Sequence, residues 1–286
     1  MKISLFVLLI YKCLCASPRL QDTEEDVCCL PNGAHFSRSK IKHYGTIKDN
    51  KNIVIVLPTI VRYDITKRPM VDYLLRTLES LMPQITDDIC VLVFIGDIVQ
   101  QNIEMIRNTL LVKYKSSLES GKLQIIEYGG TEFSIPLFIP PSRFVDTKNR
   151  IKWRSKQNIF TSFMYNYARS FGKYLLQLED DTPPVPDMIV TVKNHIKACS
   201  NITWYQLSFS KFFGDIGLLF HVNFTKTLSR HLRNFYLEQP CDMLRHELMD
   251  IFRNQIPNQK NTFGCPVLEL RYSLFNHIGK ISTVLN

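Results

Sequence analysis

Three adjacent carboxylates, Glu179, Asp180 and Asp181, are the residues of this sequence whose types and spacing most directly indicate chemistry. They follow the apolar run YLLQL at residues 174–178, which is typical of a buried strand. Like charges at a strand end repel one another unless a cation lies among them. Mg²⁺ and Mn²⁺ bind carboxylate oxygens together with substrate phosphates. The cluster therefore predicts a divalent metal site, and the alternative is an acidic loop that is simply solvated.

A basic segment, RIKWRSK at residues 150–156, precedes a helix that the pattern predicts over about residues 157–171. Four of its seven residues are cations, and Lys156 is the last of them. A helix N-terminus flanked by cations favours a bound phosphate. The segment is therefore a candidate anion site, with a solvated basic loop as the alternative.

Asp242 is a candidate general base, because a carboxylate near a hydroxyl can accept its proton. It lies at the start of a helix expected to end near Phe252, so the alternative role is an N-cap. Arg62 follows the first predicted strand, where a ligand would meet the edge of the sheet. His277 has no assigned partner and is first interpreted as structural.

These residues need an α/β scaffold, and the hydrophobic pattern predicts one. Continuous apolar strands are expected at residues 53–57, 89–95, 123–126 and 174–178, with the first one ended by Pro58. Helical spacing is found at residues 69–82, with Pro69 in the first turn, and at residues 99–119. Strands that alternate with helices indicate a mainly parallel sheet. Residues 133–146 form a proline-rich loop of the kind that often carries function.

The N-terminus indicates the compartment. Residues 1–16 are predicted to be a signal peptide cleaved near Cys15 or Ala16, because Lys12 interrupts the apolar run well short of the roughly 20 residues that a membrane span needs. The alternative is a short signal-anchor. Residues 17–50 are polar and stem-like, and residues 51–286 form the folded domain. The sequons at Asn201 and Asn223 are candidate N-glycosylation sites.

Cysteine usage agrees with an oxidising compartment. Six cysteines lie beyond the predicted leader, and some of them are expected to pair. Cys90 lies within an apolar strand and is expected to be a buried free thiol. The sequence has no cysteine or histidine spacing typical of a zinc site.

Composition excludes several classes of protein. The 286 residues are 45% hydrophobic and 21% charged, which is ordinary for a folded domain and excludes a disordered or fibrous chain. The net charge is +9, but the basic residues are scattered and form no stripe typical of nucleic-acid binding. Nucleic acid is therefore not an expected partner.

Five short stretches, taken together, resemble the N-acetylglucosaminyltransferase IV family, which adds a β-1,4-linked GlcNAc branch to the α-1,3 mannose arm of N-glycans. They are LPTIVR at 57–62, VFIGD at 93–97, WRSKQN at 153–158, QLEDD at 177–181 and SLFNHIG at 273–279. The resemblance implies a GT-A (Rossmann-like) glycosyltransferase fold, UDP-GlcNAc as donor, an N-glycan acceptor and a divalent metal, with Mn²⁺ expected.

The resemblance also implies roles for individual residues. Asp181 would ligate the metal, and Asp180 would lie near the donor ribose. Arg62 and Asp97 would hold the uridine, and Lys156 of the matching WRSKQN stretch would join these donor-binding residues. Asp242 would be the inverting base that deprotonates the attacking hydroxyl.

The departures from the family pattern fall on the acceptor side. Ser208 stands where the family has a glutamate, Met243 replaces a tryptophan, and His246 replaces a second aspartate. Residues 182–186 (TPPVP) replace a more regular stretch, and the lectin-like domain of family members is not included before Asn286. We therefore expect a short-form enzyme of the Golgi or ER lumen, which would be secreted if the leader is cleaved. The alternatives are a catalytically weak paralogue that binds and modulates other Golgi glycosyltransferases, and a secreted carbohydrate-binding protein.

Overall fold

The structure is a computed structural model that describes residues 41–47, 50–64, 66–128, 146–202, 204–211, 214–255 and 272–280. The predicted signal peptide, most of the stem-like segment and nearly all of the proline-rich loop at 133–146 lie outside these residues.

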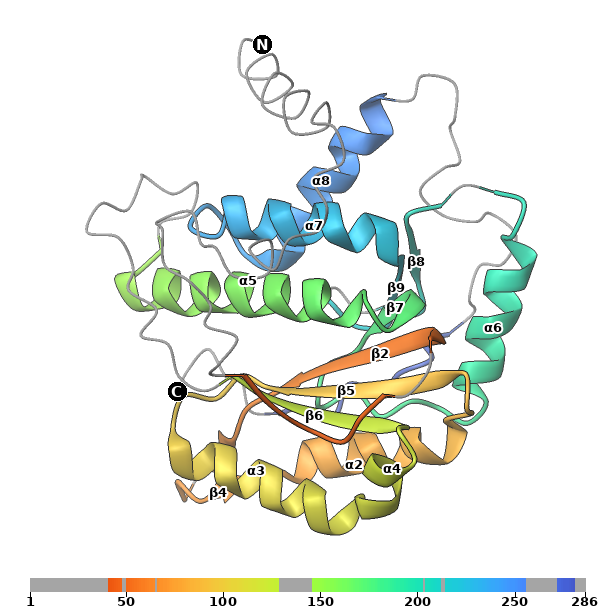
Figure 1. Cartoon of the computed structure of the whole chain (residues 1–286). Helices are drawn as coiled ribbons and strands as arrows, with labels where there is room; N and C mark the ends of the chain where they lie inside the picture. Colours follow the sequence, from red (N-terminus) through yellow and green to blue (C-terminus); the bar gives the residue numbers. More distant parts are fainter. Residues whose placement is uncertain are drawn as a thin grey trace.

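A seven-stranded sheet with the order β1-β6-β5-β2-β7-β9-β8 forms the centre of the described chain (Figure 1). Its strands are β1 (Ile41–Tyr44), β2 (Lys51–Thr59), β5 (Ile89–Ile95), β6 (Leu123–Tyr128), β7 (Gly172–Gln177), β8 (Gln206–Ser208) and β9 (Leu218–His221). The neighbours β6, β5, β2 and β7 are parallel, whereas β1, β9 and β8 pair antiparallel at the two edges. The prediction of an α/β fold with a mainly parallel sheet is therefore confirmed.

The parallel strands are apolar on both faces because helices cover both faces. All seven residues of β5 are buried, and successive residues of β2 point into opposite cores, with Ile53 and Ile55 in one and Val54 and Val56 in the other. Figure 1 shows α5, α7 and α8 on one face and α2, α3 and α4 on the other. Their bounds are α2 (Asp72–Leu81), α3 (Gln100–Lys113), α4 (Lys115–Glu119), α5 (Lys148–Ala168), α7 (Val222–Asn234) and α8 (Cys241–Gln255).

Three smaller elements complete the described fold. The short η3 (Met82–Gln84) follows α2, and α6 (Met188–Ala198) follows the carboxylate cluster. A separate two-stranded ribbon pairs β3 (Arg62–Tyr63) with β4 (Pro69–Met70). This ribbon begins at the exit of β2, so it carries Arg62 to the end of the sheet where β2 and β7 finish.

The basic segment at 150–156 does not precede the helix, so the predicted helix start near residue 157 was wrong. It forms the first turns of α5, which begins at Lys148 and has Thr147 as its N-cap; the Thr147 side chain accepts a hydrogen bond from the Arg150 backbone nitrogen at 3.3 Å. Arg154 is fully buried, pairs with Asp146 and donates to the Leu237 carbonyl at 3.0 Å. The segment is therefore helical and is anchored in the fold by Arg154, whereas Arg150 and Lys152 are exposed, and its role as an anion site stays a prediction.

Three boundaries also differ from those predicted. Pro58 lies within β2 and pairs in register with Phe94 of β5, so it does not end the strand. Pro69 lies in β4, and α2 begins only at Asp72. Ile41 and its neighbours in β1, assigned to the stem-like segment by sequence, pair with β6 and belong to the sheet.

The cysteines follow the expectation for an oxidising compartment. Cys199 is disulfide-bonded, which confirms that some of the cysteines pair. Cys90 is buried and free, as predicted, and Cys241 is also buried and free. Within the described part of the chain, no helix combines the length and the hydropathy that crossing a membrane requires.

Candidate active site

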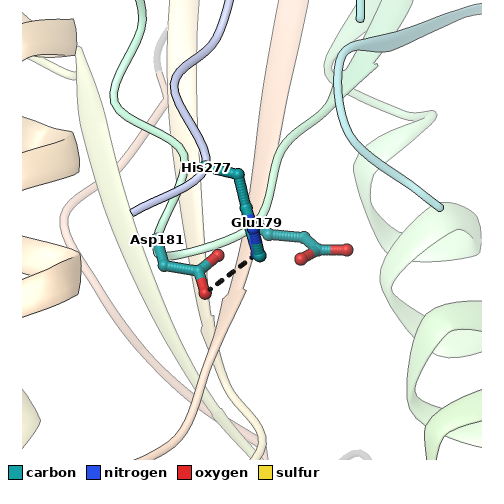
Figure 2. Close-up of side chains that lie close together, drawn as sticks. All are labelled: Glu179, Asp181 and His277. Atoms are coloured by element: carbon teal, nitrogen blue, oxygen red, sulfur yellow. Dashed lines mark ion pairs between the residues drawn. The ribbon is translucent and has the colours of Figure 1, made fainter. Parts of the chain in front are cut away.

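The carboxylate cluster lies where β7 ends, at the carboxyl edge of the parallel sheet. Asp180 and Asp181 are 5% and 2% exposed, so both have been removed from water. His277, far away in sequence, completes the cluster: one ligand atom each from Glu179, Asp181 and His277 lies within 4.8 Å of the others. Figure 2 shows the His277 imidazole between the two carboxylate side chains.

The segment at residues 272–280 is held at the cluster by its backbone. The Ile278 backbone nitrogen donates to the Asp181 carbonyl at 2.9 Å, and that of Asn276 donates to the Pro183 carbonyl at 3.0 Å. Phe275 is 1% exposed and anchors the segment in the core. A Cβ on Gly279 would lie 1.9 Å from Asp181 Oδ2, so only glycine permits this approach.

Arg62 bridges the two aspartates. Its Nη2 lies 2.5 Å from Asp180 Oδ1, and its Nη1 lies 2.9 Å from Asp181 Oδ2. Asp180 also accepts a hydrogen bond from Thr59 Oγ1 at 2.8 Å. Both oxygens of Asp180 are therefore engaged by protein groups, which leaves Asp181 as the aspartate better placed to bind a metal.

The charges of the cluster perturb one another strongly. Burial, together with the nearby charges of Asp181, Asp215 and Asp180, raises the pKa of Glu179 to about 8, although Arg62 opposes the shift. Burial also raises the pKa of Asp180 against the opposing effect of Arg62. These shifts arise because several carboxylates lie close together with little solvent, and a cation bound among them would favour their charged forms.

The residues present fit a divalent cation. Asp181 Oδ1 is buried and accepts no hydrogen bond from the described residues. A buried oxygen atom without a partner destabilises a folded protein unless an ion or a water molecule binds to it. Two carboxylates and one imidazole supply oxygen and nitrogen ligands, and substrate phosphates would supply the remainder.

Asp97 and Lys156 form a second part of the predicted donor site. Asp97 accepts hydrogen bonds from the backbone nitrogens of Val61 at 3.1 Å and Val99 at 2.9 Å, so it joins the exits of β2 and β5. Burial lowers the pKa of Lys156, and the charge of Asp97 opposes this shift. Lys156 Nζ also lies 5.2 Å from the centroid of the Phe160 ring. The structure thus brings Arg62 into contact with Asp180 and Asp181, and it brings Lys156 within electrostatic range of Asp97.

Asp242 lies in the first turn of α8, one residue inside the helix, and its carboxylate accepts a hydrogen bond from the Met243 nitrogen at 2.9 Å. Its neighbours Cys241 and Arg245 both contact Asp215. Asp215 in turn is one of the charges that raise the pKa of Glu179. Its role as a base stays a prediction.

His277 is the site residue that the pattern of the sequence alone missed. It lies 96 positions after Asp181, so no local spacing connects the two. The sequence signal for it is the SLFNHIG stretch, which contains His277 and matches the family. Its Nε2 lies 3.5 Å from Asp181 Oδ2.

The two predicted glycosylation sites lie at the surface. Asn201 and Asn223 are both exposed, and Asn223 is in the first turn of α7. Thr225 of the second sequon is buried, and its hydroxyl donates to the Val222 carbonyl at 2.7 Å. A glycan on Asn223 would have to be added before the chain folds around Thr225.

Comparison with known proteins decides the family. Residues 17–286 match a family model described as "MGAT4 conserved region". This chain belongs to that family. The strand order agrees with the α/β fold with a mainly parallel sheet that the sequence predicts.

Curated relatives are similar to this MGAT4-family chain over most of its length. The alpha-1,3-mannosyl-glycoprotein 4-beta-N-acetylglucosaminyltransferase C of Danio rerio is 30% identical over 253 residues, covering 87% of this chain and 52% of the relative. The corresponding enzyme A of Rattus norvegicus is 29% identical over 251 residues, covering 84% of this chain and 46% of the relative. The chain thus spans about half the length of the curated relatives it matches.

Solved structures resemble the chain only distantly. A mannosyltransferase from Pyrobaculum calidifontis in complex with GDP-Man and Mn²⁺ gives a TM-score of 0.36 at 11% identity, covering 62% of this chain and 46% of that one. The structure of S. aureus TarS 1–349 gives a TM-score of 0.33 at 11% identity, covering 64% of this chain and 55% of that one. The fold assignment therefore rests on the strand order.

Proposed function

We propose that this chain is an inverting, metal-dependent glycosyltransferase that transfers GlcNAc from UDP-GlcNAc to a core mannose of N-glycans. The acceptor position would be the one in the names of its relatives, a β-1,4 branch on the α-1,3 arm. The observation that carries the proposal is the cluster of half-buried Glu179, buried Asp181 and exposed His277, with Asp181 Oδ1 lacking a partner among the described residues.

The donor would lie across the carboxyl ends of β2, β5 and β7. A divalent cation bound by Glu179, Asp181 and His277 would supply positive charge for the diphosphate of the departing UDP. Arg62 would orient Asp180 and Asp181, which it already contacts, and Asp180 would lie near the ribose. Asp97 and Lys156 would border the uridine at the adjacent strand exit.

The transfer step requires a base on the acceptor side. In the proposed reaction, the Asp242 carboxylate accepts the proton of the acceptor hydroxyl as the hydroxyl oxygen attacks C1 of GlcNAc. The bond between C1 and the diphosphate oxygen breaks, UDP leaves, and the configuration at C1 inverts. Asp242 is partly exposed at the start of α8, so an incoming hydroxyl can reach it.

Mn²⁺ is the cation that we propose. Mg²⁺ and Ca²⁺ favour oxygen ligands, whereas the imidazole of His277 adds a nitrogen ligand that suits a transition metal better. Catalysis supported by Mn²⁺ and weakly or not at all by Ca²⁺ would agree with this choice.

A transfer assay tests the proposal. The purified chain is incubated with UDP-GlcNAc, Mn²⁺ and a GlcNAc-terminated biantennary N-glycan, and the product is identified by mass spectrometry with linkage analysis. We expect one added GlcNAc in wild type and none with Asp181→Ala. Neither UDP release nor product in wild type, at a concentration where UDP binding is saturated, would overturn the proposed activity.

A second candidate function is modulation of other Golgi glycosyltransferases without transfer. It is favoured by the substituted residues Met243 and His246, which are exposed on α8 next to the proposed base. Co-purification with another transferase, together with an altered product pattern of that transferase, would support it if the transfer assay is negative.

We also propose the lumen of the secretory pathway, Golgi or ER, as the site of action. The support is the disulfide bond of Cys199, because structural disulfides persist in oxidising compartments. Fractionation of cells expressing the tagged chain, with endoglycosidase treatment to detect glycans at Asn201 and Asn223, tests this location.

A further inference from the structure

A buried polar network lies behind the carboxylate cluster, at the start of α8. Asp215 and Arg245 are 6% and 3% exposed, and Arg245 Nε donates to Asp215 Oδ1 at 3.0 Å. The other carboxylate oxygen, Oδ2, accepts from the Cys241 thiol at 3.0 Å. The guanidinium also donates to Gln206 Oε1 of β8 at 3.1 Å and to the Gly214 carbonyl at 3.3 Å. None of these residues has a role in the reaction proposed above.

The network connects α8 to the end of β7. Asp215 belongs to the segment at residues 214–217, whose last residue, Gly217, donates its backbone hydrogen to the Gln177 carbonyl at 2.9 Å. Gln177 is the final residue of β7, two positions before Glu179. At the other end of the segment, a Cβ on Gly214 would lie 3.8 Å from Glu179 Oε1. The segment therefore borders Glu179 at one end and is joined to β7 at the other.

The network attaches α8 at two points on one face. Cys241 and Arg245 are four residues apart, so they lie one above the other on the helix, and both contact the same carboxylate. Asp242 lies between them in sequence and is partly exposed, whereas Cys241 and Arg245 are buried. Two-point attachment fixes both the rotation and the axial position of the first turn, and these determine where the Asp242 carboxylate lies.

A buried ion pair is a poor source of stability, because desolvation of the two charges offsets most of their attraction. What such a pair supplies is defined geometry, because each hydrogen bond of the guanidinium has a fixed direction. Here those directions join α8, β8 and the 214–217 segment at one point.

We propose that Asp215 and Arg245 are positioning residues that hold Asp242 in register with the Glu179–Asp181–His277 cluster. This inference rests on the proposed function, because it assigns the network to the transfer step. Removing the guanidinium frees the first turn of α8 and displaces the base, while the donor side remains assembled. A displacement of about 1 Å at a reacting group can lower the rate about 100-fold.

The test compares Arg245→Met with a matched variant of another ion pair. Arg107 of α3 pairs with Glu127 of β6 at 3.2 Å, and neither residue has a role in the proposed reaction, so Arg107→Met serves as the control. For each variant the turnover number of GlcNAc transfer and the dissociation constant of UDP with Mn²⁺ are measured at a temperature where the chain is folded. We expect Arg245→Met to lower the turnover number by about 10- to 100-fold, with the dissociation constant changed by less than about threefold. Arg107→Met should leave both within about twofold of wild type.

Two further variants separate positioning from general damage. Arg245→Lys retains the charge and one donor direction, so it should recover part of the turnover number. In the Asp242→Asn background, Arg245→Met should lower the turnover number by less than about threefold, because the base that Arg245 positions is already disabled. A rate loss in Arg245→Met that is no greater than that in Arg107→Met overturns the positioning role. A loss that appears mainly in UDP affinity also overturns it. The same holds if Arg245→Met lowers the turnover number by the same factor in the Asp242→Asn background as in wild type.

The two proposals fail in different ways. If wild type transfers GlcNAc and Arg245→Met behaves like Arg107→Met, only the positioning role is overturned. If wild type binds UDP with Mn²⁺ yet forms no product, the proposed function is overturned, and the positioning role is overturned with it.

Discussion

Gly279 limits how closely the C-terminal segment can approach the carboxylates. A Cβ at this position would lie 1.9 Å from Asp181 Oδ2 and 3.1 Å from Arg62 Nη1. Gly279→Ala must therefore move Asp181, Arg62 or the segment that carries His277. We expect it to weaken Mn²⁺-dependent UDP binding by at least about tenfold, which is typical when metal ligands lose their orientation. Titration calorimetry measures this change.

Gly96→Ala is the matched control for that variant. Gly96 also follows a strand at the same edge of the sheet, but the nearest atom to its Cβ would be Ile60 Cγ2 at 3.7 Å, which is an ordinary contact. UDP affinity within about twofold of wild type is expected, because an added methyl group at ordinary contact distance displaces no neighbour. Equal effects of the two alanines would contradict the close approach of Gly279 to Asp181.

Glu179 makes metal binding depend on pH. With a pKa of about 8, the side chain is mostly protonated at neutral pH, and the cation must displace that proton to bind. For one displaced proton, the apparent Mn²⁺ affinity should rise about eightfold between pH 6.5 and 7.5 and about threefold between pH 7.5 and 8.5. Electron paramagnetic resonance of free Mn²⁺ under argon measures the affinity. Glu179→Gln should remove most of this pH dependence, and an unchanged slope in that variant would exclude Glu179 as its source.

The same shift gives the sign of the effect on stability without metal. The pKa of Glu179 is raised from its ordinary value of 4.5, which applies to the unfolded chain, to about 8 in the folded chain. Between these values the folded state binds more protons than the unfolded state, so the stabilising contribution of protonated Glu179 is lost as pH rises. Mn²⁺ should therefore stabilise the fold more at pH 8 than at pH 6.

At the scale of single residues, the sequence could predict the aspartates but not their partner. Asp180 and Asp181 follow an apolar strand directly, so chain order places them at the sheet edge. His277 reaches them only through backbone hydrogen bonds between two distant segments, such as Ile278 to Asp181. No periodicity encodes that contact.

The first two turns of α5 are the element for which sequence and structure disagree most. Four cations interact unfavourably with the positive end of the helix dipole, so the sequence predicts that the helix begins after them. Burial of Arg154 against Asp146 and the Leu237 carbonyl outweighs this preference. The reason lies in tertiary contacts that local sequence does not contain.

Arg154→Met should therefore destabilise the fold and leave the donor site intact. Removing one partner of a buried ion pair typically costs about 3–5 kcal/mol, because the remaining charge stays buried. Urea denaturation gives this free energy of unfolding, and UDP affinity of the folded variant should stay within about twofold of wild type. A loss of UDP affinity without a loss of stability would instead support the predicted anion site.

Lys152→Met is the control on the same helix. Lys152 is exposed, so its substitution should change the free energy of unfolding by less than about 0.5 kcal/mol. A comparable loss in both variants would show that the helix, and not the buried pair, is responsible.

The elements predicted well are those whose burial is complete. β2, β5, β6 and β7 are nearly continuous apolar runs because helices cover both faces, and such runs are visible without an alignment. β1 has two exposed central residues and lies at an edge, so its pattern is too weak to predict. The pattern likewise predicts no element between residues 187 and 238, where short edge strands and amphipathic helices lie.

At the scale of the whole molecule, the sheet brings together three parts of the chain that are distant in sequence. The exits of β2 and β5 supply Arg62 and Asp97, the end of β7 supplies the carboxylates, and residues 272–280 supply His277. The MGAT4 family match covers all three parts. The chain spans about half the length of the curated relatives it matches, and the activity proposed for it rests on its own site.

Our central proposal is that these distant segments form one metal-dependent UDP site. Calorimetric titration of UDP, with and without Mn²⁺, tests it in wild type and in His277→Ala. Exposed His43 of β1 provides the control variant His43→Ala. We expect wild type and His43→Ala to bind UDP only with Mn²⁺, and His277→Ala to weaken this binding by at least about tenfold. UDP binding by wild type that is the same with and without Mn²⁺, or unchanged in His277→Ala, would refute the shared site.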